Sequence, residues 1–262
     1  MTMVPFWPTL ATLGNLICGF SAMLEALDGH FERSAWLILI AMLFDAADGR
    51  LARLTRSVTE FGGQLDSLAD IVSFGIAPAF LVQAFVVNNL PGYAGRFAWT
   101  QSGAFAKFAW TASCMYVACA ALRLARFNVE NTAHPTAKRF FKGLPSPAAA
   151  ALMATTVIFL RSDLGGFMPK VVAALVPIVA VVAAVLMVTK VRYPHIVSQL
   201  DFGGRPFSFL VLVVFMTMVV ALAHEIGLLL VMAFYAASGP VGLAIDQVIE
   251  RLAASDGEDT LF

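Results

Sequence analysis

The chain alternates long apolar stretches with short polar joints. Eight stretches approach or exceed the roughly 20 apolar residues that a helix needs to cross a bilayer. They cover residues 7–27, 35–54, 64–87, 103–124, 146–161, 168–189, 206–223 and 226–245. Proline and glycine mark the joints, where the chain has to turn. The last two stretches almost touch, so six to eight spans fit the pattern. The sequence therefore predicts an all-α, polytopic membrane helix bundle.

The composition supports a membrane protein and argues against a soluble domain or a nucleic-acid-binding protein. Hydrophobic residues make up 60% of the chain and charged residues 13%, with a mean hydropathy of +0.81. Soluble domains carry about 25% charged residues. The net charge is zero, which gives no basis for binding nucleic acid. The three cysteines lie in apolar runs without metal-ligand spacing, so we interpret them as small hydrophobic residues.

The charged residues indicate domain limits and orientation. We expect one membrane domain over residues 1–246 and a short acidic cytoplasmic tail over 247–262, disordered in its final SDGEDTLF segment. In an eight-span arrangement, twelve of the seventeen Lys and Arg residues fall on the side that holds the N-terminus. Basic residues favour the cytoplasmic side of a membrane. The segment 44–70 and the loop from Arg123 to Pro147 should therefore face the cytoplasm.

Two pairs of aspartates stand out in the segment FDAADGRLARLTRSVTEFGGQLDSLAD, residues 44–70. Asp45 and Asp48 are three residues apart, and Asp66 and Asp70 are four apart, so each pair shares one face of a helix. Small residues flank both pairs, namely Gly49, Ala52 and Gly62. Two neighbouring helices thus present two carboxylates each beside open space.

Two interpretations of these carboxylates compete. A single aspartate near a membrane edge can pair with a local arginine such as Arg50 or Arg53. Each aspartate at a helix centre costs about 2.5–3.5 kcal/mol, however, and such residues are usually functional. Four converging carboxylates are better neutralised by a divalent cation, because Mg²⁺ and Mn²⁺ prefer carboxylate oxygens and share substrate phosphates. We therefore favour a metal and phosphate site.

The spacing resembles the signature of the CDP-alcohol phosphatidyltransferase family. That signature is present as Asp45-x-x-Asp48-Gly49-x-x-Ala52-Arg53, eight further residues, and Gly62-x-x-x-Asp66-x-x-x-Asp70. The resemblance implies a six-helix catalytic core, a CDP-activated lipid donor, a small alcohol as acceptor and release of CMP. It also implies two Mg²⁺ or Mn²⁺ ions and a homodimer.

The same resemblance implies a role for each residue of the signature. The four aspartates would hold the two metal ions, and Asp70 would also be the general base for the acceptor hydroxyl. The CDP-lipid would contact Gly49, Ala52, Arg53, Gly62 and Ser67. Near the N-terminus the family often has Pro-Asn-x-x-Thr, whereas this chain has Thr9 in the asparagine position. Asn15, one turn beyond Thr12, would take up the contact, unless it only packs the helix.

A second informative stretch is the inner loop ALRLARFNVENTAHPTAKRFFKGLPSPAAAA. Its glycine and prolines predict a rigid turn before a helix, whose free backbone N–H groups could hold an anion. For Lys138 and Arg139 we favour contact with anionic lipid heads. Six other residues of this stretch are candidate acceptor ligands: Arg123, Arg126, Asn128, Lys142, Gly143 and Ser146.

The loop and the second half of the signature resemble the membrane-embedded prokaryotic phosphatidylserine synthases. The segments concerned are RLARFN, FKGLPSPAAA and the run from QLDSLAD to Pro78. This implies CDP-diacylglycerol as donor, L-serine as acceptor, an arginine for the serine carboxylate and the prokaryotic cytoplasmic membrane as location. The residues alone leave serine, inositol and glycerol 3-phosphate open.

A function from another class also uses intramembrane carboxylates. An ion-coupled transporter could employ the four aspartates as a cation relay. Transporters place such groups near the midplane in two related halves. Here the carboxylates crowd one membrane edge, and residues 150–262 carry no matching acidic pair within a span. We therefore favour the enzyme.

Overall fold

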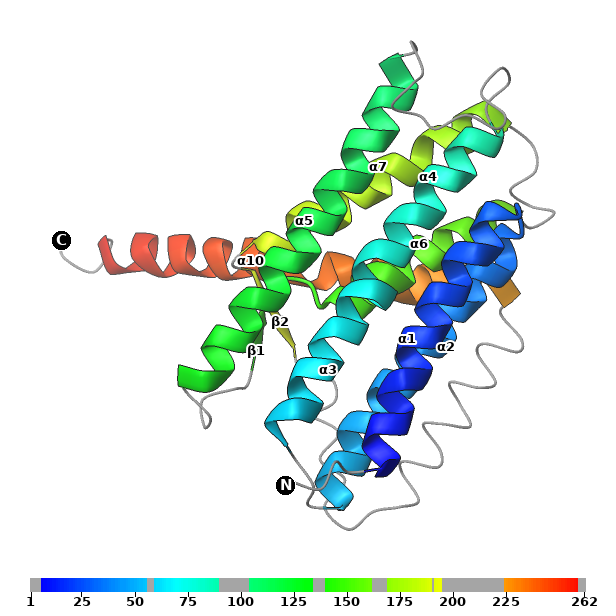
Figure 1. Cartoon of the computed structure of the whole chain (residues 1–262). Coiled ribbons are helices and arrows are strands. Elements are labelled where there is room, and N and C mark those ends of the chain that lie inside the picture. The colour runs from blue at the N-terminus through cyan, green and yellow to red at the C-terminus, as the bar shows by residue number, and fades with distance from the viewer. Residues whose placement is uncertain are drawn as a thin grey trace.

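The computed structural model describes residues 6–55, 59–89, 104–133, 140–161, 169–189, 191–194 and 224–258. These residues form helices joined to two three-residue strands (Figure 1). The helices are α1 (Phe6–Leu27), α2 (Phe31–Leu54), α3 (Glu60–Asp70), the π-helix η1 (Ile71–Ile76), α4 (Ala77–Asn89), α5 (Ala104–Ala133), α6 (Ser146–Arg161), α7 (Pro169–Val188) and α10 (His224–Glu258). The strands β1 (Phe140–Lys142) and β2 (Arg192–Pro194) pair antiparallel. The prediction of an all-α membrane bundle is confirmed.

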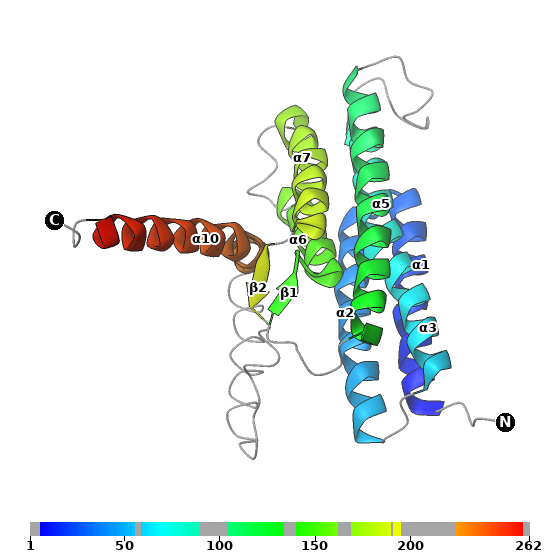
Figure 2. The same cartoon turned by 90° about the vertical axis from the view of Figure 1, so that its left-hand side faces the viewer.

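The helices form an elongated bundle with one crossing helix. Helices α1 to α5 run along a common direction, and α10 lies across them, its C-terminal part extending away from the bundle (Figures 1 and 2). The start of α1, the end of α2 and the whole of α3 gather at one end of the bundle. The aspartate pairs therefore lie near one end of the bundle.

Several described helices are suited to a membrane by length and apolar content. Four of them meet both criteria, over Phe6–Leu27, Glu60–Asn89, Ala104–Val129 and Ile226–Leu243. Ser146–Arg161 and Ala174–Val188 are shorter apolar helices. Helix α2 is long enough, but its second half carries the acidic and basic residues of the signature. The predicted span 206–223 lies outside the described residues.

Helices α3, η1 and α4 form one continuous helix with a π-helical turn in the middle. Its start is capped by Thr59, whose Oγ1 accepts a hydrogen bond from the Gly62 N–H at 3.1 Å. In an α-helix the Phe74 carbonyl would accept from residue 78, but Pro78 has no N–H. The Tyr116 hydroxyl of α5 donates to this carbonyl instead, at 2.9 Å. The buried tyrosine thus compensates for the proline.

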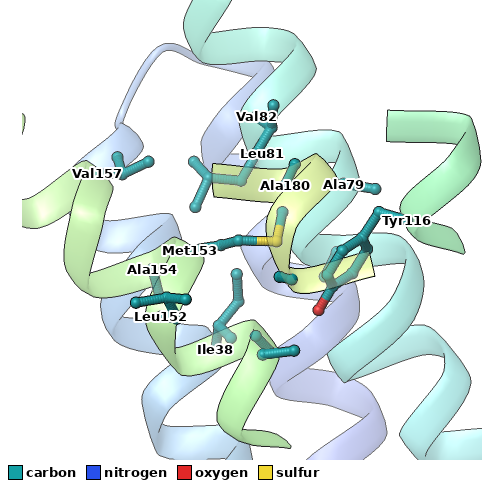
Figure 3. Packing of buried hydrophobic residues seen from close by; sticks show 14 of the residues in the cluster. Ile38, Ala79, Leu81, Val82, Tyr116, Leu152, Met153, Ala154, Val157 and Ala180 are labelled. Carbon is teal, nitrogen blue, oxygen red and sulfur yellow. The ribbon is translucent and has the colours of Figure 1, made fainter. Parts of the chain in front are cut away.

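The hydrophobic core centres on α6. Figure 3 shows Met153 of α6 among Ile38 of α2, Leu81 of α4 and Tyr116 of α5. Buried alanines let the neighbouring helices approach α6 closely: Ala149, Ala150, Ala151 and Ala154. Thr155 donates its hydroxyl hydrogen bond within α6, to the Ala151 carbonyl at 2.8 Å. A central helix with small and self-satisfied side chains suits a membrane interior.

Helix α1 approaches η1 at Gly19. A Cβ on Gly19 would lie 2.7 Å from the Ser73 Cα and would overlap the Ser73 side chain. The Ser73 hydroxyl also donates to the Asn15 carbonyl of α1 at 2.9 Å. Glycine is therefore required for the packing of these two helices.

Helix α10 continues past the predicted domain boundary. It extends through residue 247 to Glu258. Residues 255–258 of the predicted tail form the last part of this helix. Residues 259–262 of the predicted tail lie outside the described part of the chain.

We expect Gly19→Ala to destabilise the protein, because the added methyl group overlaps Ser73 and its backbone. Overpacking of this kind costs about 1–3 kcal/mol. The measurement is the thermal unfolding midpoint in detergent. Gly242→Ala is the matched control, since a Cβ there meets nothing within 4 Å. Equal midpoints for the two variants would contradict the close approach of α1 and η1.

Candidate functional site

Three aspartates form a tight carboxylate cluster at one end of the bundle. Asp45 and Asp48 come from α2 and Asp66 from α3, and one carboxylate oxygen of each lies within 4.8 Å of the others. Asp48 is 6% exposed, and the other two are half-buried. Three anionic oxygens at this separation match the ligand preference of a hard divalent cation. The predicted convergence of the two aspartate pairs is confirmed for these three residues.

The contacts of the cluster leave some ligand atoms available. Thr12 of α1 donates to Asp48 Oδ2 at 2.7 Å and also to the Pro8 carbonyl at 3.0 Å. Asp66 Oδ1 is buried and has no hydrogen-bond partner among the described residues. A buried carboxylate oxygen without a donor is costly unless something else binds it. The donor set and this orphaned oxygen both fit Mg²⁺ or Mn²⁺.

Asp70 lies beside the cluster rather than in it. Its Oδ1 accepts a hydrogen bond from Asn15 Nδ2 of α1 at 3.3 Å. It also interacts electrostatically with all three clustered aspartates. The four carboxylates thus share one site, arranged as a group of three with Asp70 beside it.

A pocket of about 140 Å³ opens next to the carboxylates. It is lined by Pro8, Thr9 and Thr12 from α1, by Asp48, Gly49 and Ala52 from α2, and by Thr59, Gly62, Gly63 and Asp66. The small residues predicted to flank the aspartates therefore do line open space. A Cβ added to Gly63 would meet nothing within 4 Å, which leaves room for a ligand.

The structure places the N-terminal candidates differently from the expectation. Thr9, which occupies the family's usual asparagine position, lines the pocket. Asn15 is fully buried and does not line the pocket. Sequence reasoning missed Thr9, although the position itself was the available signal. The side chain of Arg53 lies outside the described part of the structure.

Ser67 and Asn128 connect α3 to α5. Asn128 Nδ2 donates to Ser67 Oγ at 3.0 Å, and Ser67 Oγ donates to the Gly63 carbonyl at 3.0 Å. The sequence had assigned Ser67 to the CDP-lipid and Asn128 to the acceptor. Their hydrogen bond shows that the two assigned regions adjoin.

Arg123 and Ser146 form a second polar pair, between α5 and α6. Arg123 donates to Ser146 Oγ at 2.7 Å, and Ser146 is buried. The Arg123 Nε is buried without a partner in the described part of the chain, and no carboxylate there lies within ion-pair distance of it. Arg123 does interact electrostatically with Asp70. A half-buried cation near the carboxylates thus remains open to an anion.

The turn before α6 differs from its prediction. Gly143 has φ +85° and donates its N–H to the Val191 carbonyl at 2.8 Å. Leu144 donates its N–H to the Leu186 carbonyl at 3.0 Å. The prediction of free N–H groups is therefore wrong at these two positions. The turn instead joins the start of α6 to the end of α7, and β1 with Lys142 pairs with β2 beside it. The Lys142 side chain is outside the described part.

Comparison with known proteins gives the family. The model of the CDP-alcohol phosphatidyltransferase family matches residues 6–189. That range contains α1 to α7 and all four aspartates. The chain belongs to the CDP-alcohol phosphatidyltransferase family. It is thus a membrane-embedded transferase.

Several curated proteins are similar to this phosphatidyltransferase. The CDP-diacylglycerol–serine O-phosphatidyltransferase of Helicobacter pylori is 32% identical over 72% of each chain. The protein of the same name from Bacillus subtilis is 30% identical over 72% of this chain and 89% of the relative. The archaetidylserine synthase of Methanothermobacter thermautotrophicus is 31% identical over 72% of this chain and 70% of the relative.

We expect Mn²⁺ to bind the purified phosphatidyltransferase through the clustered aspartates. Asp66→Asn should weaken binding about tenfold or more, because losing a ligand costs at least as much as losing its supporting residues. The measurement is a Mn²⁺ titration followed by electron paramagnetic resonance. Asp28→Asn, in the exposed turn after α1, is the control. Unchanged binding by Asp66→Asn, or equal losses in both variants, would contradict the assignment.

Proposed function

We propose that this phosphatidyltransferase moves the phosphatidyl group from CDP-diacylglycerol to the hydroxyl of L-serine, giving phosphatidylserine and CMP. The observation that carries the proposal is the cluster of Asp45, Asp48 and Asp66 beside a pocket lined by glycine and alanine. Such a site suits a diphosphate and its cations. The choice of serine is supported by the names of the similar proteins and by Arg123.

Mg²⁺ or Mn²⁺ would be held by Asp45, Asp48 and Asp66, with Asp70 completing a site for two ions. The ions would neutralise the diphosphate charge and stabilise the departing CMP. Asp48 is buried, and Asp45 and Asp66 are half-buried. One carboxylate oxygen of each lies close to those of the other two, so the protein brings three ligands together from two helices. Thr12 fixes the orientation of Asp48 through its hydrogen bond.

Asp70 is the proposed general base. The serine Oγ forms a bond to the phosphorus that carries diacylglycerol, the bond from that phosphorus to the CMP oxygen breaks, and the serine proton moves to Asp70. Asp70 gives one oxygen to Asn15. Its other oxygen accepts no hydrogen bond from the described residues. That oxygen is therefore available to the serine hydroxyl.

Arg123 is the proposed ligand of the serine carboxylate. It is a half-buried cation with no ion-pair partner in the described part of the chain, and it lies near enough to Asp70 to interact with it. An arginine suits a carboxylate because its planar fork can donate two parallel hydrogen bonds. Ser146 holds the guanidinium from the α6 side. Arg126, Asn128, Lys142 and Gly143 remain candidates for the rest of the acceptor site.

The nucleotide and lipid would occupy the pocket and its membrane side. Gly49, Ala52 and Gly62 allow close approach to the backbone, and Arg53 and Ser67 adjoin them along the same helices. The distribution of basic residues supports a site that faces the cytoplasm across the prokaryotic cytoplasmic membrane. The catalytic membrane domain would cover residues 1–246. The family resemblance supports a homodimer.

We expect the purified protein to release CMP from CDP-diacylglycerol with L-serine and Mn²⁺ or Mg²⁺. Inositol should give little release, since it carries no anionic group for Arg123. Glycerol 3-phosphate carries a phosphate that an arginine can also bind, and we expect less release with it than with serine, as the names of the similar proteins indicate. The measurement is CMP formation with each acceptor in turn, with phosphatidylserine identified by mass spectrometry. Release with inositol or glycerol 3-phosphate but not with serine would reject serine as the acceptor.

We expect Arg123→Lys to raise the KM for serine about tenfold or more, because lysine keeps the charge but loses the guanidinium fork. The KM for CDP-diacylglycerol should change little. The measurement is steady-state kinetics with each substrate varied. Arg33→Lys, at an exposed position near the start of α2, is the matched control. An unchanged KM for serine would remove Arg123 from the acceptor site.

A further inference from the structure

Helix α1 directs two side-chain donors at carboxylates on two different helices. Thr12 and Asn15 are three residues apart on its buried face, which otherwise carries small residues and Pro8. Thr12 donates to Asp48 of α2, and Asn15 donates to Asp70 of α3. One turn of α1 therefore contacts both the carboxylate cluster and the separate carboxylate beside it.

Asparagine, as at Asn15, is an unusual residue for a buried position whose only role is helix packing. It is fully buried, and its Oδ1 has no hydrogen-bond partner within the described part of the chain. The structure directs Nδ2 at Asp70 Oδ1, which is the orientation that suits an ionised carboxylate. An unpaired buried oxygen destabilises a fold. A residue that breaks a packing rule in this way is expected at functional sites.

The backbone of Asn15 is fixed relative to Asp70. The Ser73 hydroxyl donates to the Asn15 carbonyl at 2.9 Å, and Ser73 lies three residues after Asp70 on the same continuous helix. Gly19 brings the two helices close enough for this contact. The hydrogen bond from Asn15 Nδ2 to Asp70 Oδ1 is therefore one of two that set the relative position of these helices.

We propose that Asn15 is a positioning residue for Asp70. By holding Oδ1, it keeps Asp70 out of the group formed by Asp45, Asp48 and Asp66, and it leaves the other oxygen for the acceptor hydroxyl. This inference rests on the proposed function, in which Asp70 is the general base. It replaces the predicted contact of Asn15 with the CDP-lipid, because Asn15 does not line the pocket.

The first test is Asn15→Leu, which removes the amide and has a similar branched shape. We expect kcat to fall by about 10- to 100-fold, because small misplacements of a reacting group have effects of that size. The KM for CDP-diacylglycerol should stay within twofold of wild type. Mn²⁺ binding, measured by electron paramagnetic resonance, should be no weaker. The thermal midpoint should fall no further than in Ser73→Ala, because each variant loses one hydrogen bond between these helices. If leucine prevents folding, Asn15→Ala replaces it for the kinetic and Mn²⁺ measurements.

Ser73→Ala is the matched control. It removes the hydrogen bond to the Asn15 carbonyl but keeps the Asn15 side chain and its contact with Asp70. We expect it to lower the thermal midpoint and to leave kcat within about threefold of wild type. A larger loss of kcat in Ser73→Ala than in Asn15→Leu would assign the effect to helix packing and overturn the proposal.

A double-mutant cycle with Asp70→Asn gives the decisive result. If Asn15 acts only through Asp70, then Asn15→Leu should cause no further loss of kcat in the Asp70→Asn background. Losses that multiply, a KM for CDP-diacylglycerol raised tenfold, or Mn²⁺ binding weakened more than threefold would each overturn the proposal.

The acceptor that supports CMP release in the wild type is used throughout the cycle. If another alcohol replaces serine, the acceptor assignment fails and the cycle still decides the role of Asn15. If no acceptor supports release, the proposed function and the role of Asn15 both fail. If the wild type is active and the losses multiply, only the role of Asn15 fails.

Discussion

Mutual repulsion among carboxylates is the constraint around which this bundle is organised. Asp45, Asp48 and Asp66 lie within one small volume, with Asp70 beside them. Arg123 interacts electrostatically with Asp70 but lies beyond ion-pair distance of it. Helix α1 brings Thr12 to Asp48 and Asn15 to Asp70. Without bound cations, repulsion among these carboxylates destabilises the folded state. The packing of the surrounding helices has to offset that repulsion.

That packing comes from helices with little side-chain bulk. Helix α6 is alanine-rich and almost entirely buried, and α1 contacts η1 through Gly19. Lipid tails offer no hydrophobic drive for helices to associate, so close contact and hydrogen bonds between helices carry more weight. The Tyr116 hydroxyl and the Ser73 hydroxyl each bond a carbonyl on a neighbouring helix. The contacts between helices that oppose the carboxylate repulsion thus lie outside the site itself.

Local spacing predicted much of this arrangement. Helical periodicity alone places Asp45 with Asp48 and Asp66 with Asp70, and the apolar runs locate the described helices. The sequence could not show that the four carboxylates separate into three and one, because that depends on which donors α1 brings to which aspartate. It also could not show that the Gly143 and Leu144 N–H groups are used, since their partners lie over 40 residues away, at Val191 and Leu186. Contacts between distant segments set both features.

The π-helical turn at η1 has a consequence for how the two halves of its helix face their neighbours. An α-helix turns by about 100° per residue, and a π-turn accommodates one extra residue. The face that carries Asp66 and Asp70 is therefore offset in phase from the face that buries Leu81 and Val82. Because of this offset, α3 contacts polar partners on α1, whereas α4 packs against the apolar core. Chemistry and packing can then change along this helix independently, provided that the extra residue is kept.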